Sequence, residues 1–145
     1  MTDTTADTTH ETAQRLRRAV TRLNRRLRSS SLGGISPAQA SMLSSIGQLG
    51  SPSLGELAAA ELVRPPSITR VVRAMEKAGL VRTTPDERDR RSTRVALTAT
   101  GRQELAAIRR RKTEFLEATL LALDPSERRR AEEAVAFLER LVERS

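Results

Sequence analysis

The apolar residues near the start of the chain recur at alternating intervals of three and four, from Ala13 onward. This spacing is the narrow seam that one helix presents to another, so the pattern predicts a dimerisation helix over residues 11–30. Thr8 and Glu11 have the spacing of a capping box at its start. Residues 1–10 are rich in Thr and Asp, which predicts a disordered tail. The seam comprises Leu16, Val20, Leu23 and Leu27.

Three shorter amphipathic helices follow, each introduced by a local start signal. Ser36 directly precedes a proline, and Ser53 is followed three residues later by Glu56. The adjacent prolines in "VRPPS" force a further start, because neither ring nitrogen can donate a helical hydrogen bond. The third helix is therefore predicted over about residues 66–78. Two short helices joined by a tight turn favour a helix-turn-helix.

The apolar period then changes from helical spacing to strict alternation. Val81 and Thr83 alternate with polar residues before "PDERDRR", and Val95 and Leu97 do so after it. Period-two runs on both sides of a polar break predict a two-stranded hairpin. An isolated hairpin is marginally stable, so its apolar face is expected to lie on the preceding helices.

Two long helices complete the chain. Thr98 or Thr100 caps the first of them, and Asp124 with Glu127 forms a capping box for the second. Both carry apolar residues at helical spacing, so residues 100–145 are predicted to be dimerisation helices. The candidate dimer contacts of the last helix are Leu138, Leu141 and Val142.

The charge distribution suggests a polyanionic partner. The net charge of the chain is +8, and residues 64–94 carry nine basic groups against four acidic ones. All of the basic residues are Arg except Lys77 and Lys112, and the planar guanidinium suits phosphates and guanine edges. The alternative is that these charges serve general solubility.

Several classes of function are excluded or disfavoured by what the sequence lacks. Cysteine is absent and His10, in the predicted tail, is the only histidine, so no metal site and no nucleophile–base pair of an enzyme is expected. There is no run of 18 apolar residues. The first twelve residues are neither basic nor apolar enough for a signal peptide, which favours a cytoplasmic protein.

The predicted third helix has the residues of a recognition helix on its outward face. Arg70 or Arg73 can form a fork with guanine O6 and N7, and Ser67 or Thr69 can donate to or accept from base edges. The alternative is an ordinary amphipathic helix with a solvated face. The candidate DNA-binding residues before the hairpin are Ser53, Arg64, Pro65, Pro66, Ser67, Thr69, Arg70 and Arg73.

The charged hairpin next to this helix favours DNA binding. Its tip suits a wing that inserts an arginine into a narrow minor groove, with Arg91 as the inserted residue and Asp89 as a carboxylate that clamps it. The alternative is a self-neutralising surface turn. The candidate DNA-binding residues of the wing are Arg82, Arg88, Asp89, Arg90, Arg91 and Arg94. The predicted fold is therefore mainly α (α+β): a winged helix-turn-helix over residues 31–99, with N- and C-terminal helices that form a dimerisation region.

The stretch from "VRPPSITR" to "VALTATG" resembles the MarR family of winged helix-turn-helix regulators. Its most specific motif is Asp89-Arg90-Arg91 followed by Val95-x-Leu97-Thr98-x-x-Gly101. The resemblance implies a homodimer, a pseudo-palindromic DNA site and, in many members, relief of repression by a small organic ligand. No cofactor is expected. Without cysteine, the peroxide-sensing mode of some relatives is excluded. The rival hypotheses are a non-specific architectural DNA- or RNA-binding protein and a helical scaffold dimer with no nucleic-acid role.

Overall fold

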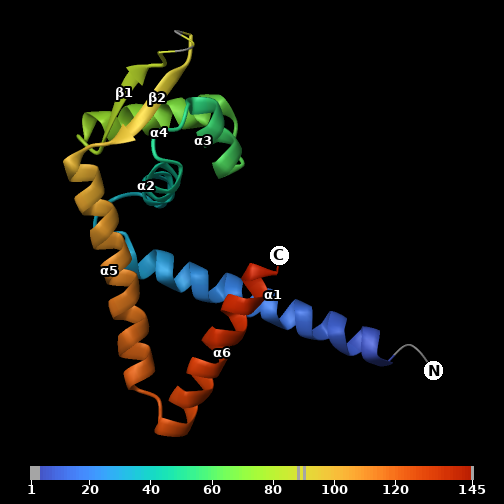
Figure 1. The fold of residues 1–145 in the computed structure, drawn as a ribbon. Helices are drawn as coiled ribbons and strands as arrows, with labels where there is room; N and C mark the ends of the chain where they lie inside the picture. Colours follow the sequence, from blue (N-terminus) through green and yellow to red (C-terminus); the bar gives the residue numbers. More distant parts are fainter. Residues whose placement is uncertain (1–3, 88, 90, 145) are drawn as a thin grey trace.

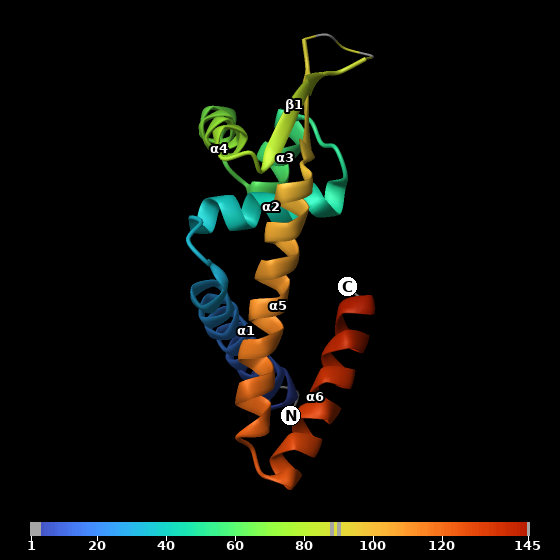
Figure 2. The same cartoon turned by 90° about the vertical axis from the view of Figure 1, so that its left-hand side faces the viewer.

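The computed structural model describes residues 4–87, 89 and 91–144 (Figure 1). A compact head of short helices and a hairpin sits at one end of a long helix, and two further long helices lie toward its other end (Figures 1 and 2). The elements in chain order are α1 (Thr4–Ser31), α2 (Pro37–Leu49), α3 (Leu54–Glu61), α4 (Pro65–Lys77), β1 (Val81–Pro85), β2 (Thr93–Leu97), α5 (Ala99–Leu121) and α6 (Pro125–Glu143).

The predicted helix starts are confirmed by the capping geometry. Ser36, Ser53 and Asp124 each accept a hydrogen bond from the backbone N–H three residues on, and the side chain at that position bonds back to the backbone N–H of the cap. Thr98, rather than Thr100, caps α5 by accepting a hydrogen bond from the Gly101 N–H at 3.0 Å. The starts of α2, α3, α5 and α6 are thus determined by side chains within one turn of each start.

The prediction of a disordered tail over residues 1–10 is wrong for the part that the structure describes. Helix α1 begins at Thr4 and runs to Ser31, so Thr8 lies inside the helix and does not cap it. Asp7 in the first turn interacts favourably with the helix dipole. His10 is also helical, and its ring Nε2 lies 2.8 Å from Gln14 Nε2, one turn away. The prediction rested on the weak helix propensity of Thr and Asp. In the structure, these local contacts and the continuous helix that follows outweigh that propensity.

The hydrophobic core lies in the head, between the helices and the hairpin. Strands β1 and β2 pair antiparallel, with Val81 opposite Leu97 and Thr83 opposite Val95. Val95 is fully buried, and its N–H donates to the Pro52 carbonyl at 2.9 Å. The expectation that the apolar face of the hairpin lies on the helices is confirmed. The core residues are Met42, Leu43, Ile46, Leu57, Ala58, Ile68, Val72, Met75, Leu80, Val81, Val95, Leu105 and Ile108.

The long helices bury much less of their apolar surface. Helix α1 packs against α5, and α6 folds back from the far end of α5 without a single buried residue among those described (Figure 2). Val20 and Leu23 of α1 are 51% and 47% exposed, and Val142 of α6 is 74% exposed. A single chain therefore leaves apolar faces of both terminal helices uncovered.

Candidate nucleic-acid interface

Helix α4 has one buried face and one polar, exposed face. Ile68, Val72 and Met75 are at most 3% exposed and anchor the helix on the core. Arg70 and Arg73 lie on the opposite, exposed face, and neither guanidinium bonds to another residue of the described part of the chain. Two arginine side chains are thus available to an external partner.

The first turn of α4 is built by its two prolines. Pro65 and Pro66 occupy positions where a helix has no internal acceptor for an N–H group, so nothing is lost by their missing donors. Arg64 precedes them as an exposed N-cap residue that makes no side-chain capping bond. Ser67 is exposed, whereas Thr69 is half-buried and donates its hydroxyl hydrogen to the Pro65 carbonyl at 3.2 Å. Ser67 is therefore the freer of these two hydroxyls.

The hairpin lies beside α4 at the same end of the molecule, opposite the α5–α6 loop (Figures 1 and 2). Glu76 of α4 joins the two elements, since its Oε1 accepts hydrogen bonds from the Thr83 hydroxyl at 2.6 Å and the Thr83 N–H at 3.2 Å. Arg82 is exposed on β1, and its guanidinium makes no hydrogen bond or ion pair with the described residues. Helix α4 and the hairpin are therefore joined by hydrogen bonds, and both present basic side chains to the solvent.

The tip of the hairpin is closed by hydrogen bonds between backbone groups and by two carboxylates, one of which is Asp86, whose Oδ1 accepts from the Asp89 N–H at 3.4 Å. The Ser92 N–H donates to the Asp89 carbonyl at 2.8 Å, and the Asp86 N–H donates to the Ser92 carbonyl at 2.9 Å. The Asp89 carboxylate accepts from the Arg91 backbone N–H at 3.0 Å. The expected clamp between Asp89 and the Arg91 guanidinium is corrected: at a spacing of two residues in a tight turn, a carboxylate reaches the main chain. Arg88 and Arg90 lie outside the described residues.

Arg94 and Ser53, two further candidate DNA-binding residues, also make bonds within the protein. Arg94 pairs with Asp86 at 2.5 Å and with Glu56 at 3.0 Å. Ser53 caps α3, and its N–H donates to Glu56 at 2.6 Å. Sequence reasoning missed the roles of Asp86 and Glu56 in this cluster, and the only available signal was the place of Asp86 directly after the strand.

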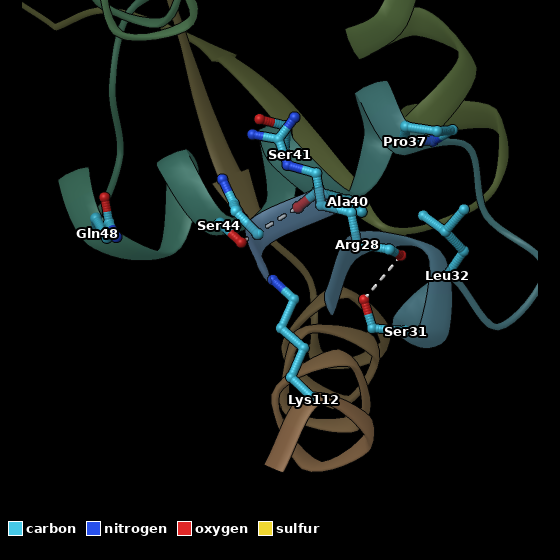
Figure 3. A pocket seen from close by; sticks show the side chains of 10 residues that line it. Arg28, Ser31, Leu32, Pro37, Ala40, Ser41, Ser44, Gln48 and Lys112 are labelled. Atoms are coloured by element: carbon cyan, nitrogen blue, oxygen red, sulfur yellow. Dashed lines mark hydrogen bonds between the residues drawn. The ribbon is translucent and has the colours of Figure 1, made fainter. Parts of the chain in front are cut away.

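The structure also contains a polar cavity of about 260 Å³ where α1, α2 and α5 meet (Figure 3). Arg28 and Lys112 bring two basic groups to its wall, and Ser41, Ser44 and Gln48 come from α2.

Within the described ranges, no three side chains of His, Cys, Asp or Glu gather as they would around a metal ion. No helix in the described part of the chain combines the length and apolarity needed to cross a membrane.

A helix-turn-helix with free arginines on its second helix, joined to a two-stranded wing, defines a winged helix-turn-helix DNA-binding protein. Comparison with known proteins agrees with this class. The model of the MarR family matches residues 35–93. An HTH-type transcriptional regulator of Mycobacterium tuberculosis is 35% identical over 128 residues, which cover 88% of this chain and 90% of that protein. An uncharacterized HTH-type transcriptional regulator of Mycobacterium leprae is 33% identical over the same shares.

Solved structures show the same fold along nearly the whole chain. A crystal structure from Pseudomonas aeruginosa has a TM-score of 0.80 and 33% identity, and the match covers 94% of this chain and 96% of that one. A Staphylococcus aureus MepR mutant, solved with a bound oligodeoxyribonucleotide, has a TM-score of 0.67 at 16% identity, over 90% of this chain and 96% of that one. The chain belongs to the MarR family of transcriptional regulators, which confirms the resemblance and the predicted fold class.

Proposed function

We propose that the protein is a repressor that binds a pseudo-palindromic operator as a homodimer in the cytoplasm and is released by a small-molecule effector. The observation that carries the proposal is the pair of unpartnered guanidiniums of Arg70 and Arg73 on α4, next to the wing. The MepR relative, which has the same fold, was solved with bound DNA and supports the choice of partner. The family relationship supports regulation rather than catalysis.

The uncovered faces of α1 and α6 support the homodimer. Leu16 and Leu27 are half-buried, whereas Leu23, Leu138 and Leu141 are 47%, 37% and 39% exposed. Contiguous apolar surface of this kind marks an interaction site, and a second copy of the chain offers a complementary one. Helices α1 and α6 both lie toward the end of the molecule away from α4 and the wing (Figure 1).

A symmetric dimer predicts the form of the operator. Two recognition helices related by a two-fold axis read half-sites whose centres lie about one helical turn, roughly 10 base pairs, apart. Selection of bound duplexes from a random pool is expected to yield a two-fold symmetric consensus at that spacing. Recovery of a single half-site would contradict the dimeric operator, and binding without sequence preference would favour a non-specific architectural protein.

Arg70→Ala is expected to weaken binding to the selected operator by about 1–3 kcal/mol and to relax preference at one position per half-site, because a guanine loses its bidentate partner. Titration of cognate and scrambled duplexes measures the effect. Arg129→Ala, an equal loss of charge on α6 remote from α4, is the control and should change little. An equal loss on cognate and scrambled DNA would make Arg70 a phosphate contact.

Asp89→Ala is expected to weaken operator binding by about three- to tenfold although it makes the protein more positive, because the Arg91 backbone loses the carboxylate that orients it. Glu87→Ala removes an exposed acid from the same loop and should leave binding unchanged or slightly tighter. Fluorescence anisotropy on an A/T-flanked operator compares the two, since A/T sequence narrows the minor groove. If both variants bind tighter, the wing is only a charged loop.

The polar cavity at the α1–α2–α5 junction is the proposed effector site. Its volume of about 260 Å³ lies just below the range of about 300–1,000 Å³ usual for ligand pockets, so it has room only for a very small molecule, and Arg28 with Lys112 favours an anionic one. The cavity lies between α1, a proposed dimerisation helix, and α2, the first helix of the head (Figure 3). A bound molecule can therefore change the position of α2 relative to α1. Release of operator by small carboxylates, abolished by Lys112→Met, tests this assignment.

A further inference from the structure

Arg94 lies in β2 at the base of the wing, and its guanidinium reaches across to the helix-turn-helix. Its Nε donates to Asp86 Oδ2 at 2.5 Å, and its Nη1 donates to Glu56 Oε2 at 3.0 Å and to the Ser51 carbonyl at 3.2 Å. The partners come from three separate segments: the wing loop directly after β1, the first turn of α3 and the α2–α3 loop. A single side chain therefore joins the wing to the unit that carries α4.

Glu56 serves the wing and the start of α3 at once. Its Oε2 accepts from Arg94 and also from the Ser53 N–H at 2.6 Å, which closes the capping box of α3. Ser53 forms an isolated β-bridge with Arg94, and the Val95 N–H donates to the Pro52 carbonyl at 2.9 Å. Any movement of the wing base must therefore disturb the first turn of α3.

Asp86 is the buried member of the three acids in the wing loop. It is 8% exposed, whereas Glu87 and Asp89 are exposed. A buried carboxylate is costly unless a cation or hydrogen-bond donors compensate it, and Arg94 supplies both a charge and a donor. Asp86 raises the pKa of Arg94 through this hydrogen bond, and the Ser53 backbone N–H lowers the pKa of Glu56. Both shifts favour the ionised forms that pair with each other.

We propose that Arg94 is a positioning residue: through Asp86 and Glu56 it fixes the wing relative to α3 and α4, and it does not contact DNA phosphate. The proposal rests on DNA binding by the wing, as stated above. Because α3 packs on α4, this cluster sets the angle between the two DNA-contacting elements. Arg94 is then no longer a candidate DNA-binding residue. Asp86 and Glu56 become part of the site because they hold Arg94 in place.

Asp86→Asn separates positioning from phosphate contact by the sign of its effect. If Arg94 contacts phosphate, removing Asp86 frees the guanidinium, makes the protein more positive and tightens binding. If Arg94 positions the wing, the same change loosens the wing, and operator affinity falls by about tenfold. Glu87→Gln, which removes the next acid in the chain, is the matched control and should not weaken binding. Tighter binding by Asp86→Asn would overturn the proposal.

Two further measurements assign the loss to the wing. Arg94→Gln should weaken binding about as much as Asp86→Asn, and the double variant no more than either, because all three changes break one cluster. On a duplex trimmed to the bases under α4, every variant should match the wild type. Equal losses on full and trimmed duplexes would overturn the proposal, since they indicate a damaged head. A wild-type protein that shows no operator preference would instead refute the proposed function.

Discussion

Leu138→Glu is expected to convert the protein to a folded monomer at micromolar concentration. Leu138 is 37% exposed in a single chain and lies on one face of α6 with Leu141. In the proposed dimer that face is covered, and burying an unpaired carboxylate there costs several kcal/mol, enough to separate the subunits. The head has its own core and should stay folded.

The loss of the dimer should also remove operator binding. A monomer engages one half-site, so the gain from linking two binding modules disappears and operator affinity falls by about a hundredfold or more. Sedimentation velocity measures the oligomeric state, and anisotropy measures binding. Leu62→Glu, at a residue 93% exposed in the head, makes the same substitution away from the proposed interface and should sediment as a dimer. A dimeric Leu138→Glu protein, or a wild type that is a stable monomer, would contradict the proposed interface.

Gly101→Ala is expected to destabilise the head by about 2–4 kcal/mol. A Cβ at position 101 would lie 1.9 Å from the Leu80 carbonyl oxygen, a backbone atom that cannot move aside as a flexible side chain can. That oxygen also accepts a hydrogen bond from the Thr98 N–H at 3.1 Å, so relief of the clash breaks the contact between α5 and the start of β1. Urea unfolding followed by circular dichroism measures the loss.

Gly55→Ala provides the matched control, because Gly55 is also a helical glycine, in α3. A Cβ there would meet only the Ser53 Oγ at 3.9 Å, which is ordinary contact. Alanine should therefore stabilise the helix by about 0.5–1 kcal/mol through its better helix propensity. Similar unfolding midpoints for the two variants would show that α5 does not rest on the Leu80 carbonyl as described.

The sequence alone determined where most elements begin and which of their faces are buried. Ser36, Ser53 and Asp124 cap their helices through residues only three positions away, so the signal for each start lies within one turn of the chain. The helical period assigned Ile68 and Met75 to the core and left the arginines of α4 outside. Such local patterns act through backbone dihedral angles and side-chain direction, and both are decided by neighbouring residues.

The tertiary structure decided how the elements support one another. Three acids lie within four residues of the wing loop, and composition does not distinguish them; only the packing of the hairpin on the α2–α3 loop buries Asp86 and leaves Asp89 at the tip. The pairing of Arg94 with Glu56 spans 38 positions, and the Leu80 carbonyl fills the space beside Gly101 from another element. These contacts depend on where distant segments meet in space. A periodic pattern of polar and apolar residues specifies which face of an element is buried, but not which distant residues that face contacts.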